Sequence, residues 1–393
     1  MSHLDYYIKH NIAPVHYDLT NLSAHFQRRE ALYRTIGLLP LAFKGARVLE
    51  VAAGTGQNSL YVSGLGVDQL TLLEPNPAGI RTIRECFQNA AFPHATPKLI
   101  EAKLEDYEAP DGFDIVLCEN WLGSSPHERT LLKKLAGFVA PRGVLVVTCV
   151  SPTGFLPNVI RRALAAKLTA GISGFSEKTA TLVSAYTPHL ATITGMTRSA
   201  VDWVQDNMLN PAYFDLCLTL PMVIQGLGRG FQAAGVSPDF RQDWRWFKAI
   251  CGDEFDFNQN LVDEYFRAAG MLLDYRRASD SADSESNRVL DGLALQLVSS
   301  VRHYEDSLAG DSSKSADPLC VLRGQLSAIK ALMDRRSEAA AGLIAEALAL
   351  LEADSLTTEM VASMPNFSGW FGRETIYLSL ERTDGSLLAG AGK

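Results

Sequence analysis

The sequence predicts an α/β fold with a mostly parallel sheet, joined to a large and mainly helical region. Three observations lead to this prediction. Short apolar runs recur over the first 150 residues, and a stretch with helical spacing separates the last two of them. One run opens through a glycine-containing turn into a helix, as in a βαβ unit. From about 151 to 363 the pattern is mainly helical, so a chain of 393 residues is expected to form two lobes.

The turn after the first apolar run carries the strongest local signal. The run 47–51 contains Glu50 near its end, and Gly54 and Gly56 follow it. A backbone that turns sharply from strand to helix beside a ligand needs such small residues. A dinucleotide fingerprint would have a third glycine at Ser59, and the Glu50 carboxylate would repel a pyrophosphate. The pattern therefore favours a ligand that is cationic in part, unless the two glycines merely form a tight turn.

A second apolar run, 70–73, ends at Glu74, eighteen residues past Gly56. The spacing of an acid after a second strand is typical of a nucleoside-binding βαβ unit. The combined pattern Glu50-x-Ala52-x-Gly54-x-Gly56 and Glu74 resembles motif I of the class I S-adenosylmethionine (SAM) dependent methyltransferases, in which glycine usually stands at the place of Ala52. The resemblance covers about residues 45 to 150. Two later stretches, 202–211 and 237–246, are weakly similar to methyltransferases associated with bacterial surface-polysaccharide genes.

The resemblance implies a Rossmann-like, mostly parallel seven-stranded sheet with helices on both faces and SAM as the cofactor. It implies that the backbone around Ala52 to Gly56 faces the methionine part of SAM and that Glu74 accepts hydrogen bonds from both ribose hydroxyls. An acid near 105 would meet the adenine amino group. The expected cofactor-binding residues are Glu50, Ala52, Ala53, Gly54, Gly56, Asn58, Glu74, Pro75, Leu104, Glu105 and Glu119.

Further apolar runs supply the remaining strands in the order that this family requires. The third, fourth and fifth strands are expected at 98–102, 113–121 and 143–150, with a helix between 126 and 140. Alternation of apolar and polar residues over 371–382 predicts a strand with one more polar face. The family that the sequence resembles ends its sheet with an antiparallel strand, and this run is expected to be that strand. Everything between the fifth strand and this one is expected to be an insertion.

The predicted strands and helices divide the chain into three parts. Residues 1–45 form an N-terminal helical lid segment, 46–190 form the SAM-binding core that 364–393 complete, and 191–363 form a helical insertion for acceptor binding or dimerisation. Amphipathic helices are expected at 287–307 and 318–353, on either side of a polar linker at 309–317. The stretches 202–211 and 237–246 gather aromatic residues with acids and arginines, which suits either a sugar-like acceptor or ordinary anchoring of the helical lobe.

Composition restricts partners and location. A net charge of −8 argues against a nucleic-acid partner, which would require a basic face. No apolar run reaches the roughly 18 to 20 residues that span a bilayer, and the first residues lack a signal-peptide core, so a cytoplasmic protein is expected. The six cysteines form no Cys-x-x-Cys pair, and we expect reduced thiols and no metal site. A homodimer through the helical insertion is one expectation for its assembly.

Methyl transfer from SAM is an in-line displacement at carbon, in which positioning can supply much of the rate. A hydroxyl acceptor would also need a general base. The candidates are His127 and His189, with Glu119 at the end of the fourth strand; His127 could instead cap a helix, and Glu119 could bind the cofactor amino group. The expected function is transfer of a methyl group to a hydroxyl or amine of a small molecule or glycan precursor. The alternatives are a noncatalytic SAM-binding or scaffold protein whose helical lobe binds a protein partner, and a nicotinamide oxidoreductase.

Overall fold

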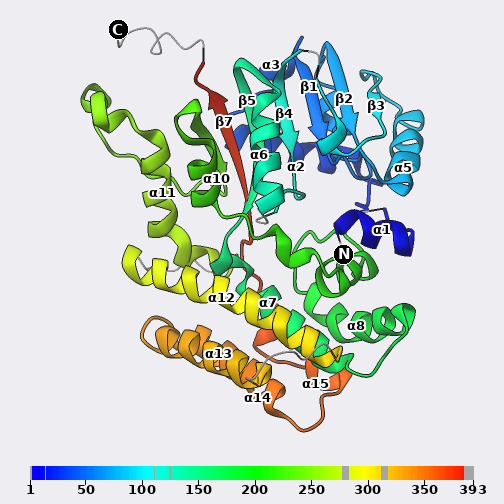
Figure 1. Cartoon of the computed structure of the whole chain (residues 1–393), viewed down its shortest axis with the longest axis vertical. Coiled ribbons are helices and arrows are strands. Elements are labelled where there is room, and N and C mark those ends of the chain that lie inside the picture. Colours follow the sequence, from blue (N-terminus) through cyan, green and yellow to red (C-terminus); the bar gives the residue numbers. More distant parts are fainter. Residues whose placement is uncertain are drawn as a thin grey trace. The chain divides into compact units, whose positions relative to one another are not determined.

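The computed structural model describes residues 2–13, 15–109, 111–123, 126–276, 283–310 and 317–384. The chain forms two compact units, each built from segments that are distant in sequence (Figure 1). The sheet unit contains Met1–Val150, Asp215–Tyr265 and Thr375–Lys393, and the helical unit contains Ser151–Phe214 and Phe266–Glu374. In the part of the chain that is described, no helix is both long and apolar enough to cross a lipid bilayer.

The sheet unit contains a seven-stranded sheet in the order β3-β2-β1-β4-β5-β7-β6. Strands β1 to β5 are parallel to one another, and β7 is antiparallel to both β5 and β6. This arrangement confirms the predicted mostly parallel sheet and its antiparallel strand near 380. The strands are β1 (Arg47–Val51), β2 (Gln69–Leu73), β3 (Lys98–Ile100), β4 (Phe113–Cys118), β5 (Val139–Val150), β6 (Phe231–Ser237) and β7 (Thr375–Arg382).

Helices cover both faces of this sheet. One core cluster joins alternate strand residues such as Val48, Leu72 and Leu117 to α2, α3, α4 and α5, and the residues between them on the strands are equally buried. Helices α6 and α10 contact β5. The helices of the unit are α1 (His3–His10), α2 (Leu22–Thr35), α3 (Pro40–Phe43), α4 (Ser59–Ser63), α5 (Pro77–Gln88), α6 (Pro126–Gly137), α10 (Leu220–Leu227) and most of α11 (Phe257–Ala268), with η1 (Leu104–Asp106), η4 (Gly228–Gly230), η5 (Phe247–Ala249) and η6 (Gly252–Phe255).

Strand β6 overturns the expectation that everything between β5 and β7 is an insertion. Its sequence, Phe-Gln-Ala-Ala-Gly-Val-Ser, has one β-branched aliphatic residue and an internal glycine, so the pattern does not predict a strand. Gly235 is required there, because a Cβ atom would lie 2.3 Å from the carbonyl carbon of Ile36 at the end of α2. The segment 215–265 thus returns to the sheet unit.

The helical unit is built around α7, whose residues 152–165 are all buried. Residues 151–190, expected in the SAM-binding core, therefore belong to this unit, because α7 and α8 supply its apolar interior. Its helices are α7 (Pro152–Leu168), α8 (Phe175–Leu190), α9 (Ala200–Trp203), α12 (Ser284–Leu308), α13 (Pro318–Asp334), α14 (Glu338–Glu352) and α15 (Thr358–Ala362), with η2 (Val204–Leu209), η7 (Ala269–Leu272) and η8 (Phe367–Gly369); η3 (Tyr213–Leu216) crosses into the sheet unit.

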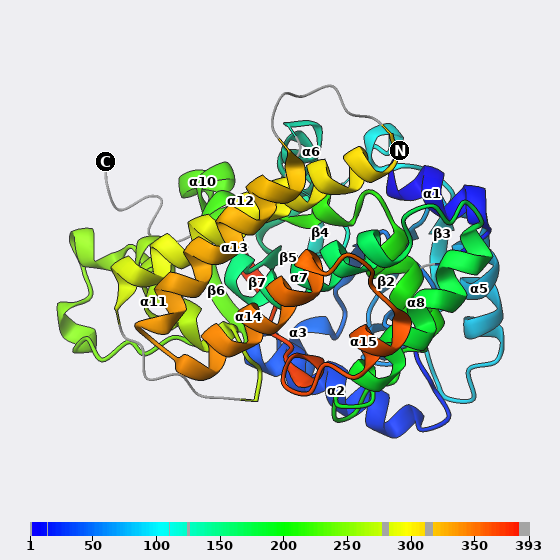
Figure 2. The same ribbon diagram turned by 90° about the horizontal axis from the view of Figure 1, so that it is seen from below.

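Helices α12, α13 and α14 lie side by side within the helical unit (Figure 2). The amphipathic helix expected at 287–307 is confirmed as part of α12, whereas the stretch 318–353 is two helices, because the chain turns at 335–337 before Ser337 caps α14. Of the expected linker at 309–317, residues 311–316 lie outside the described residues.

Candidate active site

The turn between β1 and α4 adopts the left-handed backbone conformation that its small residues allow. The φ angles are 58° at Ala52, 60° at Gly54 and 72° at Gly56. A Cβ atom at Gly56 would also lie 2.9 Å from Cγ1 of Ile83 on α5. Gly54 and Gly56 are therefore necessary for the conformation of this turn. Ala52 is the exception, since an L-residue with a Cβ atom is strained at this φ.

Replacing Ala52 by glycine is expected to raise the free energy of unfolding by up to about 1 kcal/mol, because relief of the left-handed strain exceeds the added entropy of the unfolded chain. The matched control is Ala53→Gly, whose φ is not positive and whose methyl group is buried. That variant should lose stability. Urea unfolding followed by circular dichroism measures both, and a destabilised Ala52→Gly protein would contradict the strain argument.

Glu74 follows β2 and organises the same turn from the other side. Its Oε2 accepts a hydrogen bond from the Gly54 N–H and its Oε1 accepts one from the Asn76 N–H, each at 2.8 Å. Gly79 in the first turn of α5 lets the helix approach, since a Cβ atom there would lie 2.6 Å from the Gly54 carbonyl oxygen. The sequence prediction missed Gly79, although the run Pro77-Ala78-Gly79 of small residues just after Glu74 is a signal for close helix packing.

Glu50 is a buried carboxyl group whose Oε2 has no hydrogen-bond partner among the described residues. Burial, followed by the nearby charge of Glu119, raises the pKa of Glu50 to about 7, against the opposing effects of the Ser59 hydroxyl and of Arg29. Burial also raises the pKa of Glu74 to about 7, against the opposing effect of its two backbone hydrogen bonds. A buried carboxyl oxygen without a hydrogen-bond partner is unfavourable unless a bound ligand donates a hydrogen bond or brings a positive charge to it. The site therefore fits a ligand with positive charge and hydroxyl groups, as SAM has.

These raised pKa values predict that the affinity for SAM depends on pH. A cation beside Glu50 and hydroxyl donors beside Glu74 favour the ionised forms of these carboxyl groups, so the bound protein holds fewer protons than the free protein. Affinity for SAM should therefore rise by about tenfold per coupled carboxyl group between pH 6 and pH 8. The demethylated product, S-adenosylhomocysteine (SAH), carries an uncharged thioether and should show a smaller rise. Calorimetry in buffers of different ionisation enthalpy measures the proton release on binding. Equal dependence of the SAM and SAH affinities on pH would contradict the prediction.

Glu119, directly after β4, lies in a buried polar cluster that the sequence did not reveal. Arg29 Nη2 on α2 donates to Glu119 Oε1 at 2.7 Å and to Oε2 at 2.9 Å, and the Tyr33 hydroxyl donates to Oε1 at 3.0 Å. The side chains of Arg29 and Glu119 are only 8% and 6% exposed. The N-terminal segment thus supplies a counter-charge to a residue predicted to bind the cofactor.

The carboxyl ends of β4 and β5 and the start of β7 meet beside this cluster. Asn120 has a φ of 57°, and its N–H donates to the Thr148 hydroxyl on β5 at 2.7 Å. Its amide Nδ2 donates to the Tyr377 hydroxyl on β7 at 3.3 Å. Burial, followed by the charge of Glu119, raises the pKa of Tyr377 above its usual range, so this hydroxyl stays protonated at neutral pH. Tyr377 and Asn120 can therefore exchange hydrogen bonds with a polar acceptor.

The N-terminal segment is hydrogen-bonded to the β1–α4 turn. Gln57 Oε1 accepts from the Tyr17 N–H at 2.6 Å, and Gln57 Nε2 donates to the Tyr17 carbonyl at 3.0 Å. The Thr55 hydroxyl donates to the Val15 carbonyl at 3.1 Å. Part of the expected 1–45 segment thus lies against the turn, which is the placement that a lid would need; the lid function stays a prediction.

His127 and Glu105, predicted as a base and as a cofactor ligand, are brought together. His127 Nε2 lies 2.9 Å from Glu105 Oε1, and the His127 side chain is 65% exposed. The hydrogen bond from His127 contributes to holding the pKa of the Glu105 carboxyl below its usual value, against the raising effect of burial. Lys134 Nζ also donates to the Glu105 carbonyl at 2.7 Å. The two side chains therefore form an exposed pair at the start of α6, and their predicted roles remain untested.

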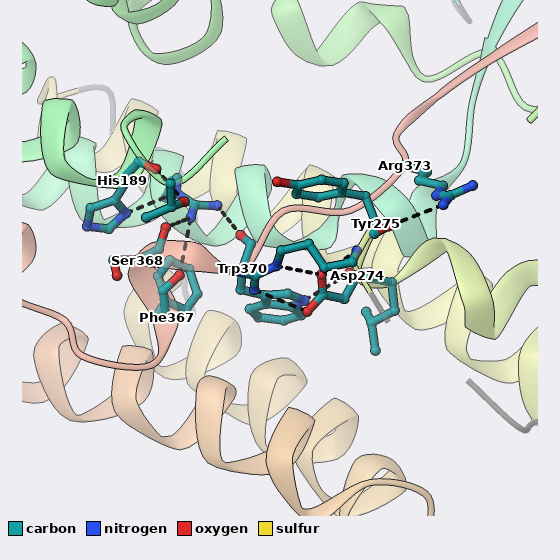
Figure 3. Close-up of polar contacts among 11 residues, drawn as sticks. His189, Asp274, Tyr275, Phe367, Ser368, Trp370 and Arg373 are labelled. Atoms are coloured by element: carbon teal, nitrogen blue, oxygen red, sulfur yellow. Dashed lines mark hydrogen bonds and ion pairs between the residues drawn. The ribbon is translucent and has the colours of Figure 1, made fainter. Parts of the chain in front are cut away.

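His189 is a core residue of the helical unit and not a catalytic base. Its Nδ1 accepts from Arg161 Nε at 3.2 Å, and its Nε2–H donates to the Val361 carbonyl at 2.8 Å, so both ring nitrogens are engaged. Burial, followed by the charge of Arg161, lowers the pKa of His189 to about 4. The Arg161 guanidinium also donates to the carbonyls of Phe367, Ser368 and Trp370 in the network of Figure 3. The sequence prediction for His189 is therefore wrong.

The other predicted cofactor residues have less specific placements. Ala53 is buried in the turn, and Asn58 and Pro75 are half-buried after Gly56 and Glu74. Leu104 is buried in η1, directly before Glu105. In the described residues no group of three or more His, Cys, Asp or Glu side chains is arranged to hold a metal ion.

The strand order, the glycine turn after β1 and the acid after β2 agree with the fold expected for a class I SAM-dependent methyltransferase domain. Residues 23–183 match a family model described as a methyltransferase domain. This part of the chain therefore resembles a methyltransferase domain. No curated protein sequence matches the chain.

Solved structures similar to this chain cover about a third of it. N-methyltransferase NodS from Bradyrhizobium japonicum WM9, in complex with SAH, is 16% identical with a TM-score of 0.28, over 34% of this chain and 66% of that one, just under two thirds of its length. Magnesium protoporphyrin IX methyltransferase from Synechocystis PCC 6803 with bound SAM is 14% identical with a TM-score of 0.29, over 37% and 74%. The CcbJ methyltransferase from Streptomyces caelestis is 20% identical with a TM-score of 0.28, over 32% and 50%.

Proposed function

We propose that this protein transfers the methyl group of SAM to a hydroxyl or amine of a small molecule or glycan precursor. The observation that carries the proposal is the buried carboxyl group of Glu50, which has an oxygen without a described partner beside the glycine turn. SAM supplies an electrophilic methyl group on a sulfonium, and a partly cationic ligand with a ribose is what Glu50 and Glu74 suit. The proposed association with surface-polysaccharide genes rests on the sequence resemblance alone.

The residues at the carboxyl ends of the strands would have different roles in such a reaction. Glu74 is held by two backbone N–H groups, which leaves lone pairs on both oxygens for the ribose hydroxyls. Glu50 lies on the strand before the turn and would stabilise positive charge. Asn120 and Tyr377 present an amide and a neutral hydroxyl that would orient the acceptor. Correct alignment of the reacting atoms can supply on the order of 7 to 11 kcal/mol of the barrier.

Glu119 is better suited to orientation than to removing a proton. Arg29 and Tyr33 donate three hydrogen bonds to its carboxylate, and these bonds occupy lone pairs that the carboxylate would otherwise use to accept a proton. An amine acceptor that binds as its free base needs no strong base before transfer. A hydroxyl acceptor would take its base from another group, and His127 stays a candidate for that role.

The test of the proposed function is transfer of tritiated methyl from SAM into fractionated metabolites of the source cell. We expect label in a small-molecule or glycan fraction with the intact protein and none with the Glu74→Ala variant. Binding of SAM without turnover on any fraction, together with a stable complex with another protein, would favour the noncatalytic scaffold instead. Failure of the intact protein to bind SAM or SAH would end both proposals.

A further inference from the structure

The segment between β6 and α11, residues 238–256, displays four large aromatic side chains on the sheet unit. Trp244 is 91% exposed, Trp246 65%, Phe247 68% and Phe255 37%. We call these four residues the aromatic surface. Side chains of this size contribute most of their stabilising energy when they are buried, so a group of them left in solvent indicates a binding surface.

Hydrogen bonds and ring contacts brace this segment. Arg241 Nη1 donates to the Ala234 carbonyl on β6 at 3.0 Å. The ring of Phe240 lies 6.0 Å from that of Tyr265 on α11. Gln232 on β6 donates to the Phe255 carbonyl at 3.4 Å. The segment is therefore tied to β6 and α11, the two elements that flank it, and it presents its aromatic residues from a defined position.

The arginines of the segment have carboxylate partners within the same segment. Arg241 pairs with Asp239 at 3.1 Å, and Arg245 pairs with Asp243 at 2.6 Å and with Glu254 at 3.5 Å. The hydrogen bond from Arg245 lowers the pKa of Asp243 to about 2, so this pair stays charged and matched at neutral pH. Because Arg241 and Arg245 are paired with carboxylates and the protein has a net charge of −8, the surface is poorly suited to a polyanion.

The chemistry of the surface favours a ligand with ring faces and hydroxyl groups. Leucine, valine and methionine do not occur in residues 238–256, and the aliphatic residues there are Ala249 and Ile250. The Lys248 ammonium lies 5.8 Å from the Trp246 ring centroid and 5.9 Å from that of Phe247, so a hydrogen-bond donor sits beside the rings. Aromatic faces stack on the apolar faces of sugar rings, while ammonium and carboxylate groups bond the hydroxyls.

We propose that the aromatic surface binds a neutral glycan, with Trp244 and Trp246 stacking on its sugar rings and the side chains of Asp243 and Lys248 bonding its hydroxyls. This surface would hold a part of the acceptor that is remote from the methylated group. In that respect the inference rests on the proposed function, and it names the glycan among the acceptors.

Tryptophan fluorescence tests the proposal directly, because of the five tryptophans Trp203 and Trp370 are buried and Trp244 and Trp246 are exposed. Neutral malto-, cello- and chito-oligosaccharides are titrated into the protein, and quenching by iodide is measured. We expect at least one series to protect the exposed tryptophans, with about tenfold weaker binding by calorimetry in Trp244→Ala/Trp246→Ala. The matched control is Leu41→Ala, an exposed apolar residue elsewhere on the sheet unit, which should bind normally.

Two outcomes would overturn the proposal. One is that no oligosaccharide series protects the tryptophans at millimolar concentration. The other is that sedimentation shows self-association that the double variant abolishes, which would identify the surface as a contact between copies of the chain. SAH binding is measured on the same samples, and the double variant should retain it. Loss of SAH binding by the intact protein would instead count against the proposed function, so the two failures are distinguishable.

Discussion

Replacing Glu74 by alanine is expected to weaken SAM binding by about 100- to 10,000-fold. Two hydrogen bonds to an ionised group contribute roughly 1.5 to 3 kcal/mol each, and each 1.4 kcal/mol is a factor of about ten in affinity. The substitution would remove the acceptor for the ribose hydroxyls. It would also release the Gly54 and Asn76 N–H groups that now donate to the carboxylate, so the turn itself would lose a support.

Isothermal calorimetry with SAM and SAH measures this effect. Glu108→Ala is the matched control, because Glu108 is an acid of the same unit whose side chain is 85% exposed and pairs with Lys134. It should bind both ligands as the intact protein does. Circular dichroism of both variants establishes that they are folded. Wild-type affinity in a folded Glu74→Ala protein would mean that SAM does not bind at the β1–α4 turn beside Glu74.

Replacing Arg29 by methionine should lower the free energy of unfolding by about 3 to 5 kcal/mol, because it leaves the buried charge of Glu119 without its partner. Methionine keeps the length of the side chain, so the loss reports the charge rather than a cavity. Burial opposes the charge on Arg29, but the attraction of Glu119 and its hydrogen bonds raise the pKa of the guanidinium, so Arg29 is charged. The added substitution Glu119→Gln removes the uncompensated charge and should restore part of the stability.

The same helix supplies the control for this prediction. Arg34 on α2 pairs with Glu30 at 2.7 Å, but their side chains are 54% and 39% exposed. Exposed pairs contribute about 0 to 1 kcal/mol, so Arg34→Met should change stability little. Urea unfolding midpoints compare the three variants. An equal effect of Arg29→Met and Arg34→Met would show that the Arg29–Glu119 pair contributes no more than a surface pair.

The sequence predicted the parts of the fold that depend on local pattern. The strands from β1 to β5 each contain a short apolar run, and the turn at Gly54 and Gly56 requires small residues for its φ angles, so neighbouring residues in the sequence predict both. Strand β6 has no such pattern. It is the edge strand beside β7, and the close approach of Ile36 to Gly235 is a contact between residues distant in sequence. The sequence pattern also assigns residues 152–165 of α7 to the SAM-binding core, whereas they belong to the helical unit. The unit in which a helix is buried depends on the elements that pack around it, and these are distant in sequence.

The site was predictable where one residue acts on its neighbours and not where distant residues pair. Glu74 and the glycines form one local unit, and the structure places them together. Arg29 and Glu119 are separated by 90 positions, and no spacing rule connects them. His189 illustrates the opposite error, since its own sequence neighbourhood does not reveal that this candidate base is buried. Its partner Arg161, on another helix, makes it part of the interior.

The position of β7 between β5 and β6 has a consequence for biosynthesis. Because β7 hydrogen-bonds to both, the valine-rich edge of β5 has no neighbour on that side until the ribosome has extended the chain from Val150 to Thr375. An unpaired strand edge of this kind readily joins edges of other molecules. The nascent polypeptide therefore has to shield this edge throughout the translation of the helical unit, and premature termination in that interval would yield aggregation rather than a smaller working enzyme.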